Sequence, residues 1–147
     1  MSLVSVYKFL TKWVDKSQVL MLLGFRLYIA KVFFMSGLTK IKSMDTTLML
    51  FQYEYAVPHI PYQLAAYSST FVELVFPILL IVGLAGRFSA TGLFVLNYVA
   101  AISYPDISPG GMNDHFYWGA LLLVLVMHGP GKLSIDALLQ KRFFSQA

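Results

Sequence analysis

Four stretches of the chain are almost entirely apolar, and short polar or proline- and glycine-rich segments separate them. The stretches cover residues 19–37, 64–84, 88–103 and 115–128. A helix needs roughly 20 apolar residues to cross the ~30 Å hydrocarbon core of a bilayer. The first two stretches have this length. The last two are shorter, so they must pack against neighbouring helices or extend with polar ends to cross the bilayer. The pattern predicts an all-α integral membrane four-helix bundle, as a single domain over residues 1–147.

Residues 1–17 have a different, amphipathic pattern. Lys8, Lys12 and Lys16 recur every four residues and share one helical face, and apolar side chains fall on the opposite face. Such a helix is suited to the membrane surface, although a frayed tail also fits because short helices need packing to persist. We predict an N-terminal interfacial helix and, at the other end, a short C-terminal helix that Ser134 caps.

The connections between the apolar stretches set their arrangement. Residues 85–87 allow only a tight turn, so the second and third spans form an antiparallel hairpin. Residues 38–63 form a long connection, in which a short helix beginning near Asp45 is ended by two later prolines. Residues 104–114 contain two prolines and two glycines, which predicts a loop.

The composition agrees with a membrane protein. Of the 147 residues, 58% are hydrophobic and 12% are charged, whereas soluble domains are nearer half apolar and a quarter charged. A soluble fold of this size cannot hide so much apolar surface, so we expect the lipid bilayer to be its solvent.

The chain has no cysteine, which excludes thiol catalysis and cysteine-ligated iron–sulfur clusters, and it has no evident haem or flavin motif. Its net charge of +4 is too small and too scattered to indicate nucleic acid.

Lysines and arginines concentrate on one side of the predicted membrane. With four spans, both termini and the turn at residues 85–87 share one side, and that side carries seven basic residues. The opposite side carries two, Lys40 and Lys42. Because basic residues are enriched in cytoplasmic segments, we predict a multi-pass protein with both termini in the cytoplasm.

Four polar side chains fall inside the predicted spans, where a charge is costly unless it is paired. They are Arg26, Lys31, Glu73 and Asn97. Counted at 1.5 Å per residue from the cytoplasmic end of each span, they lie ~10 to ~18 Å deep and can form one layer near the midplane. Pro77 frees the carbonyl of Glu73 from its helical donor, and Arg26 has donors enough for that carbonyl and the carboxylate. We therefore predict an Arg26–Glu73 pair.

Two interpretations of this layer stay open. One is an ion pair that fixes helix register, because polar groups also hold membrane helices together. The other is a proton relay or a site for a quinone headgroup, because the layer holds more polar capacity than one pair uses. In that case, aromatic side chains line a pocket that reaches Glu73 from the outer side or from lipid. The aromatic candidates are Phe33, Phe34, Phe94 and Tyr98.

A second group of polar residues lies on the predicted outer side. His59 lies in the first loop, and Asp114 and His115 begin the fourth span. Imidazole and carboxylate groups can bind a transition metal, but the spacing matches no metal motif. The alternative is a helix start that Asn113 or Asp114 caps, with His115 at the water boundary. We predict no firm metal site and keep these three residues as weak candidates.

Four short motifs occur in order along residues 20–140. Arg26 precedes F-x-x-G-x-x-K, which ends in Gly37 and Lys40, and an intramembrane Glu73-Leu74 precedes G-L-x-x-R, which ends in Arg87. The last motif is G-P-G-x-x-S-x-D, formed by Gly129, Pro130, Gly131, Ser134 and Asp136. In these motifs and their order, the chain resembles the DoxX/DoxD-like family of small four-helix bacterial membrane proteins.

The resemblance implies a location in the bacterial cytoplasmic (inner) membrane and points to Arg26, Lys40 and Glu73. Members of the family are linked to a thiosulfate:quinone oxidoreductase subunit, to oxidative-stress complexes and to operons for copper-binding peptides. This chain has no cysteine and no cofactor motif, so the resemblance implies a subunit that assists redox or stress chemistry with a bound quinone or a membrane or periplasmic protein partner. A non-catalytic scaffold that docks partners, and a small transporter or metal-handling protein, are the alternatives.

Overall fold

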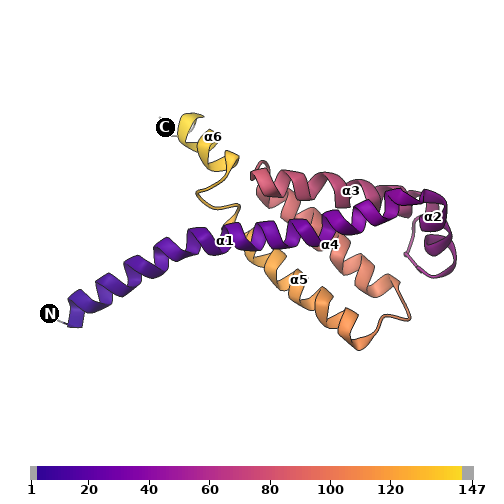
Figure 1. Cartoon of the computed structure of the whole chain (residues 1–147), viewed down its shortest axis with the longest axis horizontal. Helices are drawn as coiled ribbons and strands as arrows, with labels where there is room; N and C mark the ends of the chain where they lie inside the picture. The colour runs from indigo at the N-terminus through magenta and orange to yellow at the C-terminus, as the bar shows by residue number, and fades with distance from the viewer. Residues whose placement is uncertain (1–2, 144–147) are drawn as a thin grey trace.

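The protein is a bundle of helices, seen in a computed structural model that describes residues 3–143 (Figure 1). In chain order the elements are α1 (Leu3–Lys42), α2 (Met44–Tyr53), α3 (Tyr62–Val82), α4 (Gly86–Ser103), α5 (Pro109–His128) and α6 (Ile135–Phe143). No strand occurs within residues 3–143, so the all-α prediction is confirmed there. The first two residues of the predicted interfacial helix lie outside the described residues.

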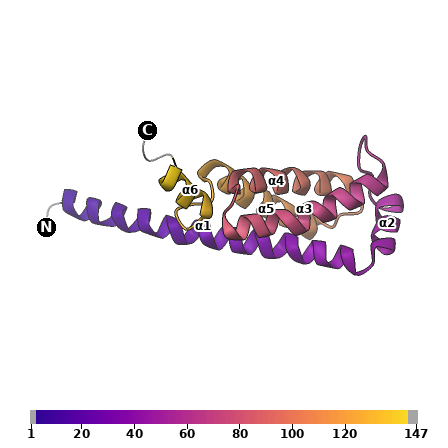
Figure 2. The same ribbon diagram turned by 90° about the horizontal axis from the view of Figure 1, so that it is seen from above.

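The four long helices pack side by side. Helix α3 packs against α1 and α4, and α5 packs against α4 and α1. Aliphatic and aromatic side chains fill the space between them, among them Ile29, Phe33, Leu80, Leu93, Leu122 and Leu125. Figure 2 shows α2 at one end of these helices and α6 at the other. We call these the α2 end and the α6 end.

Helices α1 and α3 are long and apolar enough to cross a membrane, judged by length and composition. Only 28% of the most apolar 18-residue stretch of α1 is buried, and only 39% of the corresponding stretch of α3 is buried. The core helix of a soluble protein, by contrast, is mostly buried. Large apolar side chains also lie exposed on the outside of the packed helices, including Phe71, Ile78, Val95 and Phe116. The architecture is that of an all-α membrane protein.

Helix α1 is one uninterrupted helix of 40 residues, where the sequence predicted an interfacial helix followed by a separate span. The predicted break was wrong, because no glycine or proline lies between Lys16 and Val19 to interrupt the helix. The N-terminal turns of α1 project past the other helices in both views (Figures 1 and 2). A surface location for these turns stays a prediction.

Helix α5 begins at Pro109, within the segment that the sequence predicted to be a loop. Ser108 caps it, since its hydroxyl accepts a hydrogen bond from the Gly111 amide at 3.1 Å. Proline is favoured in the first turn because its missing N–H has no helical partner there. The Ser-Pro-Gly-Gly segment is therefore a helix start, and it gives α5 20 residues, close to the length that a span needs.

Candidate functional site

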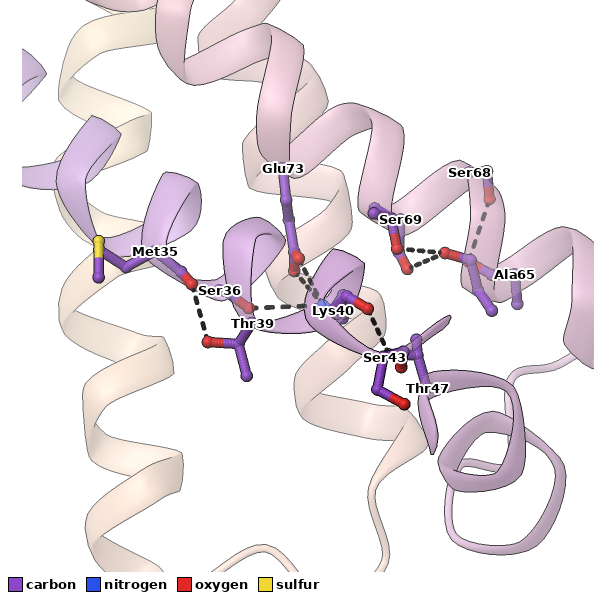
Figure 3. Close-up of polar contacts among 12 residues, drawn as sticks. Met35, Ser36, Thr39, Lys40, Ser43, Thr47, Ala65, Ser68, Ser69 and Glu73 are labelled. Atoms are coloured by element: carbon purple, nitrogen blue, oxygen red, sulfur yellow. Dashed lines mark hydrogen bonds and ion pairs between the residues drawn. The ribbon is translucent and has the colours of Figure 1, made fainter. Parts of the chain in front are cut away.

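The polar centre of the packed helices is an ion pair between Lys40 on α1 and Glu73 on α3 (Figure 3). The Lys40 Nζ lies 2.5 Å from each carboxylate oxygen of Glu73 and donates to Ser36 Oγ at 3.4 Å. The side chains are only 18% and 8% exposed. Charged hydrogen bonds of this kind are about twice as strong as neutral ones, so the pair holds α1 to α3 at this level.

Gly37 lets Lys40 reach Glu73. A Cβ at Gly37 would lie 2.9 Å from Leu74 Cδ2 and 3.1 Å from the Glu73 carbonyl carbon. The missing side chain therefore allows α1 and α3 to approach closely, as small residues do between membrane helices. Lys40 follows one turn later on the same face. The Thr47 hydroxyl of α2 donates to the Lys40 carbonyl at 3.0 Å and fixes α2 across the end of α1.

The predicted Arg26–Glu73 pair is wrong. Arg26 is only 1% exposed, and its guanidinium donates to four main-chain carbonyls at 2.6–2.8 Å. The acceptors are the carbonyls of Leu80, Ile81, Pro130 and Leu133. Two of them belong to the last turn of α3, where a cation is favoured by the helix dipole; the Leu80 carbonyl also accepts from the Gly83 amide at 3.2 Å. Arg26 therefore clamps the end of α3 to the segment after α5, at the α6 end.

Three further motif residues, Gly83, Ser134 and Asp136, complete this clamp. Gly83 ends α3 in the left-handed conformation, with φ of 69°. The Asp136 carboxylate accepts hydrogen bonds from the amides of Ala85 and Gly86, each at 2.8 Å, and so caps the start of α4. Ser134 caps α6 as predicted, because its hydroxyl accepts from the Ala137 amide at 3.2 Å. These motif residues thus tie the turn between α3 and α4 to the start of α6.

Gly83→Ala is expected to lower stability by at least about 2 kcal/mol, because an L-residue is strained at this φ. Its Cβ would also lie 2.4 Å from Ser134 Cβ. Gly24→Ala is the matched control, since Gly24 is helical and nothing lies within 4 Å of a Cβ there. That change should be neutral or stabilise by up to about 1 kcal/mol. Thermal unfolding in detergent measures both, and equal midpoints would contradict the clamp geometry.

The other two polar residues of the predicted layer lie apart from the ion pair. Asn97 on α4 pairs with His115 on α5: its Nδ2 donates to the His115 carbonyl at 2.9 Å, and its Oδ1 lies 2.8 Å from His115 Nδ1. Lys31 is exposed on α1. The predicted single layer is therefore wrong, because Arg26, Glu73 and Asn97 each have a different partner. A ligand-binding role for the four residues stays a prediction.

A cavity of about 420 Å³ lies beside the Lys40–Glu73 pair, towards the α2 end. All four long helices line it, together with α2 and the loops that follow α2 and α4. Its aromatic lining consists of Phe33, Phe51, Tyr55, Tyr104 and Trp118. Of the aromatic residues named from the sequence, Phe33 lines this cavity, whereas Phe94 and Tyr98 line a separate groove of about 260 Å³ between α4 and α5.

Two residues with hydroxyl groups, Ser103 and Tyr55, lie beside the cavity. Ser103 is fully buried, and its Oγ has no hydrogen-bond partner among residues 3–143. Tyr55 stacks between Phe51 and Tyr104, with ring centroids 4.8 and 5.2 Å apart. Burial raises the pKa of the Tyr55 phenol, and the negative charge of Glu73 raises it further. The phenol therefore stays protonated at neutral pH and can donate a hydrogen bond.

The weak metal candidates do not come together. Within residues 3–143, no group of three or more histidine, cysteine, aspartate or glutamate side chains lies close enough to hold a metal ion. His115 lines the cavity and faces Asn97. His59 lies in the loop after α2, with φ of 66°.

The family resemblance pointed to Lys40, but reasoning from the spans did not pair it with Glu73, and neither approach found Tyr55 or Ser103. The first span was predicted to end at residue 37, which placed Lys40 in a loop. The spacing of Gly37 and Lys40 was the available signal, since residues three apart share a helical face. No local pattern marks Tyr55 or Ser103, because chain segments distant in sequence bring them to the cavity.

This geometry defines a class of protein: a helical, membrane-associated protein with a buried ion pair beside a cavity. A family model described as DoxX matches residues 21–105. An uncharacterized protein of Haemophilus influenzae (strain ATCC 51907 / DSM 11121 / KW20 / Rd) is 35% identical over 127 residues, which are 82% of this chain and 83% of that protein. No solved structure matches the chain. The chain belongs to the DoxX family, as its motifs predicted.

Proposed function

We propose that this DoxX-family protein is a multi-pass subunit of the bacterial inner membrane that binds a quinone headgroup in the cavity beside Lys40 and Glu73. Both termini are cytoplasmic in this proposal, because seven basic residues lie on that side and two on the other. The α2 end, with the cavity, then lies towards the periplasm. The observation that carries the proposal is the position of the cavity against a buried ion pair.

The size and chemistry of the cavity suit such a headgroup. Its volume of about 420 Å³ falls in the range of small-molecule sites, which are mostly apolar with a few convergent polar groups. Its aromatic walls can stack on a planar ring. A quinone offers two carbonyl oxygens; the Tyr55 hydroxyl supplies a donor for one, and the Ser103 hydroxyl supplies a donor for the other once its side chain rotates towards the cavity. A bound acceptor would also satisfy the Ser103 hydroxyl, whose burial without a partner is costly.

The protein's part in this proposal is to bind and orient the headgroup and to relay protons to it through the Glu73 carboxylate, which is ionised in its resting pair with Lys40. Reduction of a quinone to a quinol takes up two electrons and two protons. The electrons come from a membrane or periplasmic protein partner, since this chain has no thiol to supply them. The subunit therefore assists a redox reaction rather than completing one alone.

A short-chain ubiquinone analogue is expected to raise the thermal midpoint of the purified protein in detergent. Binding at 100 times the dissociation constant stabilises the folded state by about 2.7 kcal/mol. Ala100→Phe should abolish the rise, because Ala100 lines the cavity and a phenyl ring would occupy space that the headgroup needs. Val95→Phe is the control, since Val95 lies on the same helix but is 54% exposed outside. An equal rise in all three proteins would contradict binding in the cavity.

A further inference from the structure

A hollow at the α6 end is lined by three basic side chains. Arg87 at the start of α4, His128 at the end of α5 and Lys132 in the segment after α5 all face the same volume of about 460 Å³. Arg87 and Lys132 are exposed. Arg87 is the last residue of a motif that the clamp around Arg26 leaves without a role.

The acidic side chain in this hollow already accepts hydrogen bonds from the protein's own main chain. Asp136 also lines it, but both of its carboxylate oxygens accept hydrogen bonds from the amides of Ala85 and Gly86. The basic side chains are only weakly held: Arg87 Nη2 donates to the Met127 carbonyl at 3.3 Å, and His128 Nδ1 lies 3.1 Å from the Val124 carbonyl. Lys132 makes no hydrogen bond or ion pair within residues 3–143. The hollow therefore presents free positive charge.

The edge of the hollow is apolar. Phe88 lines it and is 66% exposed. The neighbouring Met127 and Leu133 are 69% and 53% exposed. A basic hollow with apolar residues beside it matches an amphiphilic anion, whose charge meets the cations and whose chains lie along the exposed apolar side chains.

We propose that this hollow binds the headgroup of an anionic phospholipid, with its phosphate between Arg87, His128 and Lys132 and its acyl chains against Phe88. The proposal shares with the proposed function only the placement of the chain in the membrane. The α6 end lies at the level of the headgroups in that placement, because α3, α4 and α5 all begin or end there. A second class of site thus lies at the opposite end of the protein from the quinone cavity.

The test compares lipids on the purified protein in a neutral detergent, by native mass spectrometry and thermal midpoint. Phosphatidylglycerol should remain bound and raise the midpoint, whereas zwitterionic phosphatidylcholine and millimolar inorganic phosphate should not. Arg87→Gln with Lys132→Gln should weaken the retention of phosphatidylglycerol by roughly tenfold or more, the order expected when a lipid phosphate loses two cations. Lys132→Gln alone should weaken it less, and it keeps the Arg87 contact with Met127 in case the double variant folds poorly.

Lys141→Gln with Arg142→Gln is the matched control, because it removes two positive charges from α6 outside the hollow. It should retain phosphatidylglycerol as the unchanged protein does. Equal loss in this control would show that net charge alone attracts the lipid, and protection by inorganic phosphate would show a site for small anions; either result would overturn the proposal. Ubiquinone-dependent stabilisation of the Arg87/Lys132 variant should stay unchanged, which separates this test from that of the cavity.

Discussion

Arg26→Ala is expected to prevent the protein from folding stably in detergent. The change leaves four main-chain carbonyls without the donors that the guanidinium supplies. A hydrogen bond to a charged group contributes about 1.5–3 kcal/mol, and some relaxation of the segment will recover part of the loss. We expect a destabilisation of more than about 4 kcal/mol, which approaches the whole stability of a typical domain at ~5–15 kcal/mol.

Size-exclusion profile and thermal midpoint measure this loss. Lys31→Ala is the matched control, because it removes a cation from the same helix at an exposed position, and its midpoint should stay unchanged. Arg26→Lys should fall between the two, since an ammonium has three donors and no fixed planar geometry. A midpoint for Arg26→Ala within a few degrees of the unchanged protein would show that the clamp does not hold α3 to the segment after α5.

Glu73→Gln is expected to destabilise the protein by about 3 kcal/mol, the lower end of the range for breaking a buried ion pair. The lower end applies because the Lys40 side chain is 18% exposed, so water can partly solvate the stranded ammonium. Lys40→Met should destabilise by a similar amount, because it strands the carboxylate. The double variant should lose less than the sum of the two, because it leaves neither charge alone.

A double-mutant cycle isolates the interaction between the two side chains. We expect a coupling of at least about 1 kcal/mol between Lys40 and Glu73. A cycle that combines Glu73→Gln with Arg26→Lys should give additive effects, because these side chains have no partner in common. Coupling of Glu73 to Arg26 and not to Lys40 would contradict the arrangement of the site.

The helices could be predicted from the sequence because a bilayer imposes a strong, local constraint on apolar length. The errors came from helix ends. The Ser108-Pro109 pair was interpreted as a loop although it is a helix start, and the predicted break ahead of Val19 had no residue to cause it. Boundaries depend on single capping residues, whereas the existence of a span depends on the sum of many apolar residues.

The polar contacts were harder to predict because several acceptors compete for one donor. Depth along a helix placed Arg26 within reach of Glu73, but four main-chain carbonyls, two at the end of α3 and two in the segment after α5, accept all of its hydrogen bonds. Lys40 reaches Glu73 only because Gly37 lets two helices approach. Such an approach depends on tertiary packing, which one sequence does not reveal. The family motifs still pointed to the right residues, since Arg26, Lys40 and Glu73 all hold the helices together.

The most direct test of the quinone site is the fluorescence of Trp118, which lines the cavity. The chain has two tryptophans, so Trp13→Phe leaves Trp118 as the single reporter. Titration with a short-chain ubiquinone analogue should quench it along a saturable curve in the Trp13→Phe protein, and the saturable part should vanish when Ala100→Phe is added. Weak, linear quenching that is the same in both proteins would contradict the proposal that the cavity beside Lys40 and Glu73 binds a quinone.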